Sequence, residues 1–371
     1  MKKLLPVLLF LAVAASVRAV TPDHNKANAI FESVKSSYSH GNISADSLVN
    51  IALFHKVGNP EVAARCLRLA ADAGNPRALT ELGVIYAFSP AFSSRTDEGV
   101  SLLKAAADAG YKEADGYLGY YYFQKSKFSD ALKYLEAAAP LTMGIEYATL
   151  GSMYLQGKGV KESGSKAREN FHRSAMLGLP RGMSLYASLL GTKNGGAINY
   201  PDAFFWFYIA GELGDNYSRV MLYRPMLPQE QTDNEVSNDT RKALTWIEAV
   251  HSGKSMKNEP LYKEGFLKGL KARELAAEKG DDWSRFYLGG MNYNGDFLNQ
   301  NYAQALRYYE AIARHDSLPR PMLAIVHERL ADMYRDGKGT RKDTRLAERH
   351  TRLAATYGSL PAYTLTQSLP H

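Results

Sequence analysis

Residues 147–180, YATLGSMYLQGKGVKESGSKARENFHRSAMLGLP, contain the pattern on which the predicted fold depends. Within this stretch, 150-LGSMYLQGKGV-160 has paired glycines around a lysine, and 330-LADMYRDGKGT-340 has nearly the same arrangement. A phosphate-binding loop needs four residues between its glycines, and a Ser or Thr directly after Gly-Lys. In the first copy five residues separate Gly151 from Gly157, and Lys158 is followed by Gly159. No strand pattern precedes either copy. We therefore interpret both stretches as turns between paired helices.

The first half of this pattern recurs along the chain. Leu150 is followed by Gly at offset +1, Met at +3, Tyr at +4 and Gly at +7, and Leu330 by Ala, Met, Tyr and Gly at the same offsets. A sequence period of 20 to 50 residues is typical of repeat proteins. Related copies start at Leu82, Leu118 and Leu288, and a degenerate copy starts at Leu185.

A second pattern follows each of these copies. It has small residues at offsets +7 and +8 in most copies, for example Ser174 and Ala175, and most starts are 36 residues apart. The starts are Ala63, Gly99, Ala131, Ala167, Ala203, Gly269, Ala305 and Ala347. Glycine closes six copies at offset +11: Gly74, Gly110, Gly178, Gly214, Gly280 and Gly358.

The two patterns together predict a repeated helix–turn–helix unit. Offsets 0, +1 and +4 share one face of a helix, so the first half predicts an amphipathic helix. The small pair in the second half allows two helices to approach closely, and the closing glycine suits a left-handed C-cap. One unit cannot bury its apolar face alone, so neighbouring units must stack. The sequence therefore predicts an all-α fold, an α/α solenoid.

The stretch 147–180 resembles a Sel-1-like repeat, a tetratricopeptide-like helical unit, and the resemblance covers roughly residues 45–359. It implies a right-handed superhelix and an adaptor that binds other proteins. Three departures from the family pattern are visible. The copies at Leu118 and Leu185 lack the Gly-x-Gly turn, residues 215–262 are irregular, and the cysteine pairs of some secreted members are missing.

The N-terminus has the layout of a cleaved secretory signal. Lys2 and Lys3 precede an apolar run, and Val17-Arg18-Ala19 places small residues at a cleavage site. We expect cleavage after residues 1–19, and a periplasmic product without membrane insertion. Cleavage removes three of the 45 basic residues and leaves 42 against 38 acidic ones, without a dense basic run, which argues against nucleic-acid binding.

A gap of 66 residues between the pattern starts Ala203 and Gly269 suggests two arrays. The first array is predicted to cover 20–253 and to close with a helix over 240–253. A linker over 254–260 is expected to lead into the second array, 261–371.

A search for catalytic motifs is negative. The histidines do not cluster in the sequence, and His172 and His350 are interpreted as exposed polar residues on second helices. The only cysteine, Cys66, is interpreted as a buried small apolar residue rather than a regulatory thiol. We expect no cofactor, no metal and no enzymatic activity.

One further feature of the sequence points to binding. The helix face opposite the predicted core should be polar if it were solvated, but it carries apolar side chains. Offsets −2, +2 and +5 of the first helices point away from the predicted core, and the resemblance implies that this face lines the concave side. Alternatively, a tightly wound solenoid packs these residues against neighbouring units. In the second array the same offsets give Phe286 and Tyr293, but also Glu328, Asp332 and Arg335. In the first array the candidate partner-binding residues are Val84, Ala87, Tyr120, Phe123, Leu155, Met183, Ala187 and Leu190.

Two functions from different classes fit these observations. The first is a periplasmic scaffold that holds a partner protein or peptide in its groove. The second is an immunity protein that inhibits a toxic effector, for which a phospholipase is a plausible target. The sequence alone leaves the choice between them open.

Overall fold

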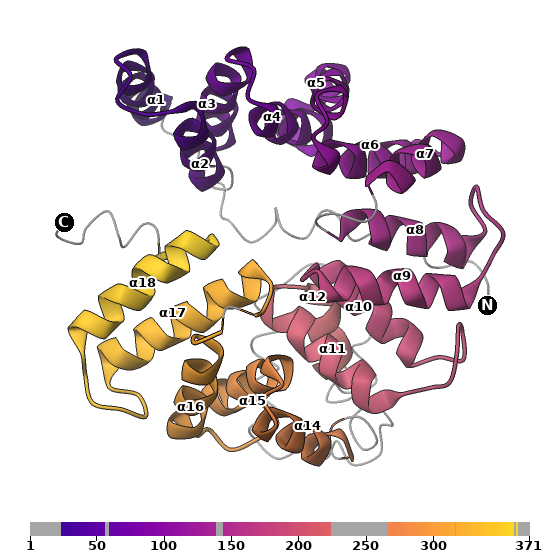
Figure 1. Cartoon of the computed structure of the whole chain (residues 1–371), viewed down its shortest axis with the longest axis vertical. Coiled ribbons are helices and arrows are strands. Elements are labelled where there is room, and N and C mark those ends of the chain that lie inside the picture. The colour runs from indigo at the N-terminus through magenta and orange to yellow at the C-terminus, as the bar shows by residue number, and fades with distance from the viewer. Residues whose placement is uncertain are drawn as a thin grey trace, which may run out of the picture. The chain divides into compact units, whose positions relative to one another are not determined.

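The computed structural model describes residues 24–55, 59–138, 144–223, 266, 268–315, 317–359 and 361–362. The regular structure of these residues is helical throughout, which confirms the all-α prediction (Figure 1). The chain forms two compact units, residues 1–118 and residues 119–371, and each is described by itself. The predicted signal, the closing helix over 240–253 and the linker over 254–260 lie outside the described residues.

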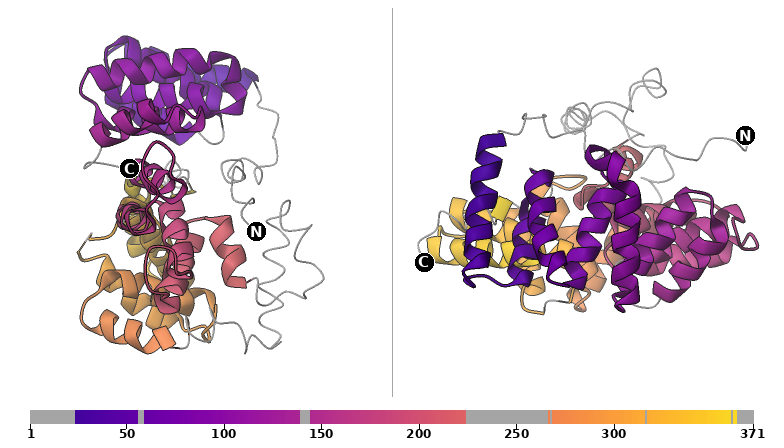
Figure 2. Two further views of the ribbon diagram at one scale, coloured as in Figure 1. Left: turned by 90° about the vertical axis from the view of Figure 1, so that its right-hand side faces the viewer. Right: turned by 90° about the horizontal axis from the view of Figure 1, so that it is seen from above.

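The first unit is a row of helices in which α2 packs against α3, α3 against α4 and α4 against α5, while α1 packs mainly against α3 (Figure 2). Its core contains fully buried leucines from three of them, Leu48, Leu67 and Leu82. Asparagine caps start two of the helices: Asn59 Oδ1 accepts a hydrogen bond from the Val62 amide, and Asn75 Oδ1 one from that of Ala78. The helices are α1 (His24–Ser39), α2 (Ala45–His55), α3 (Pro60–Asp72), α4 (Pro76–Phe88), the 3-10 helix η1 (Pro90–Arg95), α5 (Thr96–Asp108) and the start of α6 (Lys112–Gln124).

The second unit continues the series of helical hairpins. The predicted partners contact one another, α8 with α9, α10 with α11, α15 with α16 and α17 with α18. The helices after α6 are α7 (Phe128–Ala138), α8 (Ile145–Gln156), α9 (Gly164–Met176), α10 (Pro180–Leu190), α11 (Tyr200–Glu212), α12 (Asn216–Tyr223), α14 (Lys268–Glu278), α15 (Asp282–Asn294), α16 (Tyr302–Ile312), α17 (Arg320–Asp336) and α18 (Thr344–Tyr357).

The glycine–lysine stretch forms the turn between α8 and α9, as predicted. Gly157 and Gly159 have φ angles of 63° and 72°, a left-handed conformation that glycine adopts at little cost. A Cβ on Gly159 would lie 2.7 Å from Phe128 Cβ, so the turn is pressed against the start of α7. The second copy forms the equivalent turn between α17 and α18.

The small pair lies where two helices approach closely, which confirms that prediction. Ser174 and Ala175 are fully buried, and a Cβ on Gly182 of α10 would lie 2.1 Å from Ser174 Oγ. The closing glycines follow the second helices in the expected left-handed conformation. Their φ angles are 80° (Gly74), 85° (Gly110), 85° (Gly178), 94° (Gly214), 102° (Gly280) and 106° (Gly358).

One hydrophobic core extends through the second unit from Ala175 in α9 to Ala347 in α18. At its centre α11 carries five consecutive aromatic residues, 204–208, all of them buried. This helix packs against α10, α14 and α15. Helices from either side of the predicted linker therefore share one core, while the linker itself stays a prediction.

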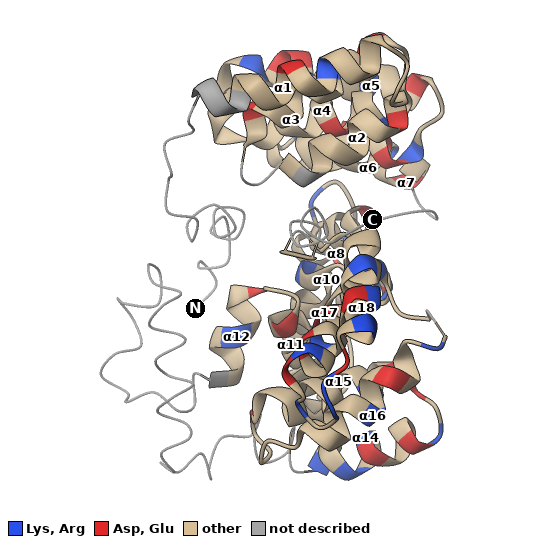
Figure 3. Ribbon diagram, turned by 90° about the vertical axis from the view of Figure 1, so that its left-hand side faces the viewer, with Lys and Arg blue, Asp and Glu red and all other residues tan. Residues whose placement is uncertain are grey.

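Cys66 is fully buried in α3, as expected, and burial raises the pKa of its thiol to about 11. The described helices include none with the length and apolarity needed to cross a bilayer. Lys and Arg are interspersed with Asp and Glu over these helices (Figure 3).

Candidate functional site

The structure divides the candidate partner-binding residues of the second unit into two groups. Tyr120, Met183 and Leu190 are buried, with exposed fractions of 8%, 0% and 1%. Phe123 and Leu155 are half-buried. A partner that binds this unit as it stands can therefore touch the second group, whereas the first group belongs to the interior.

The predicted exposure of Met183, Ala187 and Leu190 is not found, because α10 is covered on two sides. These residues belong to the same core as the aromatic residues of α11. The repeat offsets describe a single helical hairpin, here α10 with α11. Because α10 also packs against α8 and α9, its second face is covered as well. The alternative, that such positions pack against neighbouring units, holds for these three residues.

Tyr120 is held in place by its own helix. Its hydroxyl accepts a hydrogen bond from the Gln124 side-chain amide, and burial raises the pKa of the phenol. Val84 and Ala87 lie in α4 of the first unit and are both half-buried. Phe286 and Tyr293 of α15, which the offsets also select, are buried in the second unit's core.

Phe123 lies in a group of aromatic side chains at the junction of α6 and α7. Its ring is 6.0 Å from that of Phe128, and Tyr122 stacks on Tyr134 with ring centroids 5.4 Å apart. Phe123 packs with Tyr122 and Phe128 against a small core that includes Leu135 and Met153. Of these half-buried rings only Phe123 belongs to the predicted stripe, and with Leu155 it is the part of that stripe that a partner can reach in the second unit.

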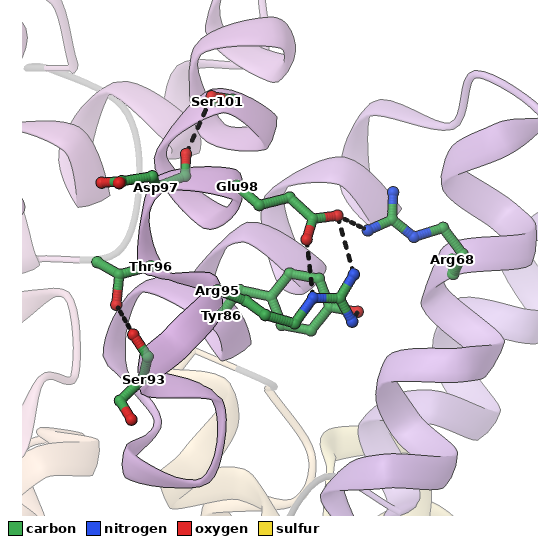
Figure 4. Close-up of polar contacts among 8 residues, drawn as sticks. All are labelled: Arg68, Tyr86, Ser93, Arg95, Thr96, Asp97, Glu98 and Ser101. Carbon is green, nitrogen blue, oxygen red and sulfur yellow. Dashed lines mark hydrogen bonds and ion pairs between the residues drawn. The ribbon is translucent and has the colours of Figure 1, made fainter.

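A polar network in the first unit was not predicted from the sequence. Glu98 of α5 accepts hydrogen bonds from Arg95 at 2.7 and 3.0 Å and another from Arg68 of α3 (Figure 4). Arg95 also donates to the Tyr86 hydroxyl and lies over its ring. The hydrogen bonds from Arg95 are the main cause of the lowered pKa of Glu98. No repeat offset signals these contacts, because they join four different elements, α3, α4, η1 and α5.

Next to this network is a cleft of about 410 Å³ between α3, α4 and η1. Its arginines are already neutralised: Arg95 pairs with Glu98, and Arg65 pairs with Glu32 at 3.3 Å. The cleft therefore lacks the uncompensated positive charge of an anion site. Its lining is Asn59, Pro60, Glu61, Ala64, Arg65, Tyr86, Ala91, Phe92 and Arg95.

Two histidines that are distant in sequence come together, and the prediction that His350 is exposed is wrong, because its side chain is half-buried here. His327 of α17 and His350 of α18 form a hydrogen bond between their Nδ1 atoms, 2.9 Å apart. The rings stack between Tyr357, which faces His327, and Tyr334, which faces His350. Burial, with the neighbouring His327 and Arg349, lowers the pKa of His350 to about 4. His172 is exposed, as expected.

A half-buried carboxylate joins three helices of the second unit. Glu212 at the end of α11 accepts a hydrogen bond of 3.0 Å from the Asn294 side chain of α15. Arg329 of α17 lies 3.9 Å from the same carboxylate and also covers the ring of Tyr293. Burial raises the pKa of Glu212, and Arg329 opposes that shift. The contacts stabilise the packing of the three helices.

The described residues contain no group of three or more His, Cys, Asp or Glu side chains placed to hold a metal ion. Some serine and carboxylate contacts tie a loop to the start of a helix. Ser317, for example, donates a hydrogen bond of 2.6 Å to Asp282, which also pairs with Arg285 in the first turn of α15.

The family model described as the Sel1 repeat matches the chain six times, over more than half of its length. No curated protein matches the chain. The matched residues are 53–75, 76–111, 148–179, 181–215, 284–317 and 326–359.

Two solved structures are similar to this chain. One is a protective antigen of uropathogenic Escherichia coli strains, described as displaying an SLR fold. It is 19% identical with a TM-score of 0.39, and the match covers 88% of this chain and 80% of that one. The other is a Sel1 repeat protein from Oxalobacter formigenes, 22% identical with a TM-score of 0.44, for which the match covers 57% of this chain and 87% of that one.

Proposed function

Because the chain belongs to the Sel1 repeat family, we propose that it is a non-enzymatic periplasmic scaffold that binds a partner protein. Sel1 repeats generally mediate protein–protein interaction. The partner is proposed to bind the face that the sequence resemblance assigns to the concave groove.

The observation that supports this proposal is the half-buried aromatic group around Phe123. Its rings lie at the edge of a small core rather than inside the main one. Aromatic side chains that keep exposed surface on a folded protein often mark interaction sites. We infer that Phe123 and Leu155, both half-buried, are contact residues on neighbouring first helices.

The periplasmic location rests on the signal-like order of residues 1–19. N-terminal sequencing of the exported protein tests it, and the expected first residue is Val20. A mature protein that still begins at Met1 would contradict this part of the proposal.

Photo-crosslinking in intact cells tests the scaffold itself. A benzophenone amino acid replaces Phe123 or, as a control on another face, Leu275 of α14, which is 50% exposed. We expect a discrete protein adduct from position 123 and none from position 275, with the partner identified by mass spectrometry and by reciprocal capture. Equal labelling from both positions, or no adduct from position 123, would overturn the proposed surface.

The identity of the captured protein separates the two candidate roles. A toxic effector such as a phospholipase, inhibited by the purified protein, supports the immunity role, whereas a cell-envelope component supports the scaffold. If the purified protein itself hydrolysed peptidoglycan, phospholipid or peptide, and a point substitution abolished this without unfolding it, the non-enzymatic assignment would fail.

A further inference from the structure

Lysines in the stretch 125–166 lie over aromatic rings on neighbouring helices of the second unit. Lys158 is the central example, since its Nζ is 5.6 Å from the ring centroid of Phe123 and 5.7 Å from that of Phe128. The other pairs are Lys125 with Tyr121, Lys127 with Tyr122, Lys133 with Tyr134 and Lys166 with Tyr154, at 5.0 to 5.9 Å. We call these five lysines and their rings the lysine–aromatic surface.

Packing between two hairpins makes this surface continuous. The turn that carries Lys158 is pressed against the start of α7, where a Cβ on Gly159 would contact Phe128. Val160, which follows in the same turn, packs against the small core that also supports Tyr122, and it lines a cleft with Lys166. Lysines from the α6–α7 turn, α7 and the α8–α9 hairpin therefore lie over rings that α6, α7 and α8 carry.

The lysines of this surface lack carboxylate partners. No described Asp or Glu oxygen lies within 4.0 Å of their ammonium groups, whereas Arg68, Arg285 and Arg335 all form ion pairs. Exposed carboxylates are present in the same stretch but do not pair with these lysines; they are Asp130, Glu136 and Glu162. The surface thus has positive charge that the described residues leave uncompensated.

From this geometry we propose that the lysine–aromatic surface binds an acidic segment of a partner protein. The inference rests on the proposed function and adds the chemistry of the partner. An ammonium group over a ring retains its charge while its aliphatic stem covers apolar surface, so carboxylates and neighbouring apolar groups are both accommodated. Complementary charge also increases the association rate and the specificity of such a complex.

Two features favour a polypeptide over a nucleic acid. Phe123 and Phe128 pack against each other, Tyr122 stacks on Tyr134, and the first three of these residues pack against a core, so little of their ring faces is left to stack on bases. The interspersed carboxylates Asp130 and Glu162 would repel a uniform polyanion, but a peptide with spaced acidic residues avoids them.

The test measures binding of a fluorescein-labelled peptide with spaced acidic residues, five glutamates alternating with alanines, to the purified full chain by fluorescence anisotropy. The surface variant has Gln in place of Lys125, Lys127, Lys133 and Lys158. The control variant, which has the same net charge, has Gln in place of four exposed lysines elsewhere in the second unit: Lys193, Lys268, Lys271 and Lys279. A third variant with Arg at the four surface positions retains their charge.

We expect the surface variant to bind the peptide about tenfold more weakly than the wild type, and the control and Arg variants to bind within about twofold of it. Circular dichroism melts should be equal for all four proteins. If the surface variant does not fold, the double variant Lys125→Gln/Lys127→Gln in the exposed turn replaces it.

Three results would overturn the inference: no binding by the wild type, equal weakening in the surface and control variants, or equally tight binding of an oligothymidylate or of anionic lipid vesicles. None of them affects the proposed scaffold, because the photo-crosslink from position 123 tests that separately. Conversely, the crosslink from position 123 could be absent while the surface variant still binds the acidic peptide more weakly. That outcome would contradict the proposed scaffold surface but support binding of acidic peptides by the lysines.

Discussion

At the scale of single residues, the small and apolar positions of the repeat were predictable because steric demands leave few alternatives. Ser174 and Ala175 are small because α10 approaches α9 at that level, and Gly178 has a φ angle of 85° that other residues rarely adopt. Contacts between long side chains follow no such rule. Glu98, for example, reaches Arg68 thirty positions earlier in the chain, and its partner cannot be read from the repeat period.

Ala175→Leu should destabilise the protein by about 1–3 kcal/mol, because the larger side chain overfills a fully buried contact. Chemical denaturation measures the change. Met176→Leu is the matched control, since Met176 is 44% exposed and the exchange conserves volume. Equal stability of the Ala175→Leu variant and the wild type would mean that the small pair is not tightly packed.

Tyr120→Ala should lower the free energy of unfolding by about 2–4 kcal/mol, because Tyr120 is only 8% exposed and its removal leaves a cavity. Phe123→Ala, at a half-buried position in the same helix, should cost less. Thermal melts of the two variants decide the ranking. A larger loss for Phe123→Ala would place Phe123 in the core and remove it as a contact residue.

At the scale of helices, the sequence predicted which segments pair but not what covers the resulting hairpins. The helices α10 and α11 form the expected pair, yet α11 is apolar around its circumference and is buried between α10, α12, α14 and α15. Met183 and Leu190 are consequently internal although their offsets pointed away from the hairpin. The periodicity of apolar residues identifies one buried face of a helix, but it does not show whether a further helix covers the opposite face.

The α17–α18 hairpin should lose stability in acid through His350. Its pKa is about 4 in the fold and 6.5 in the unfolded chain, so the unfolded state binds more protons between these values. The stabilisation is present above pH 6.5 and is lost as the pH falls toward 4. Groups that face the pair are Tyr334 with its partner Glu310, Asp343, Arg349, and Tyr357 with Arg320 above it.

Thermal melts at pH 7 and pH 5 check this sign. After a discount for partial exposure of His350, the wild type should lose about 1 kcal/mol more than His350→Phe, in which the stacked ring is kept but cannot titrate. An identical pH dependence in both proteins would show that folding does not lower the pKa of His350.

At the scale of the whole molecule, the repeat pattern predicted the class of fold. The boundary between the two compact units was not predictable in this way, because it falls in a copy that departs from the pattern. The change from one compact unit to the next falls at Leu118 and Gly119, inside α6. This copy of the repeat lacks the Gly-x-Gly turn. The boundary predicted at 254–260 and the secretory signal lie outside the described residues and stay predictions.

The central claim is that this solenoid binds a protein through its half-buried aromatic surface, and calorimetry with the partner identified by crosslinking tests it most directly. We predict saturable binding that Phe123→Ala weakens by about 2 kcal/mol, with unchanged helicity by circular dichroism. The control variant Leu275→Ala, at an exposed position of α14, should bind the partner as tightly as the wild type does. Undiminished binding by Phe123→Ala, or no binding between the two purified proteins, would contradict the account.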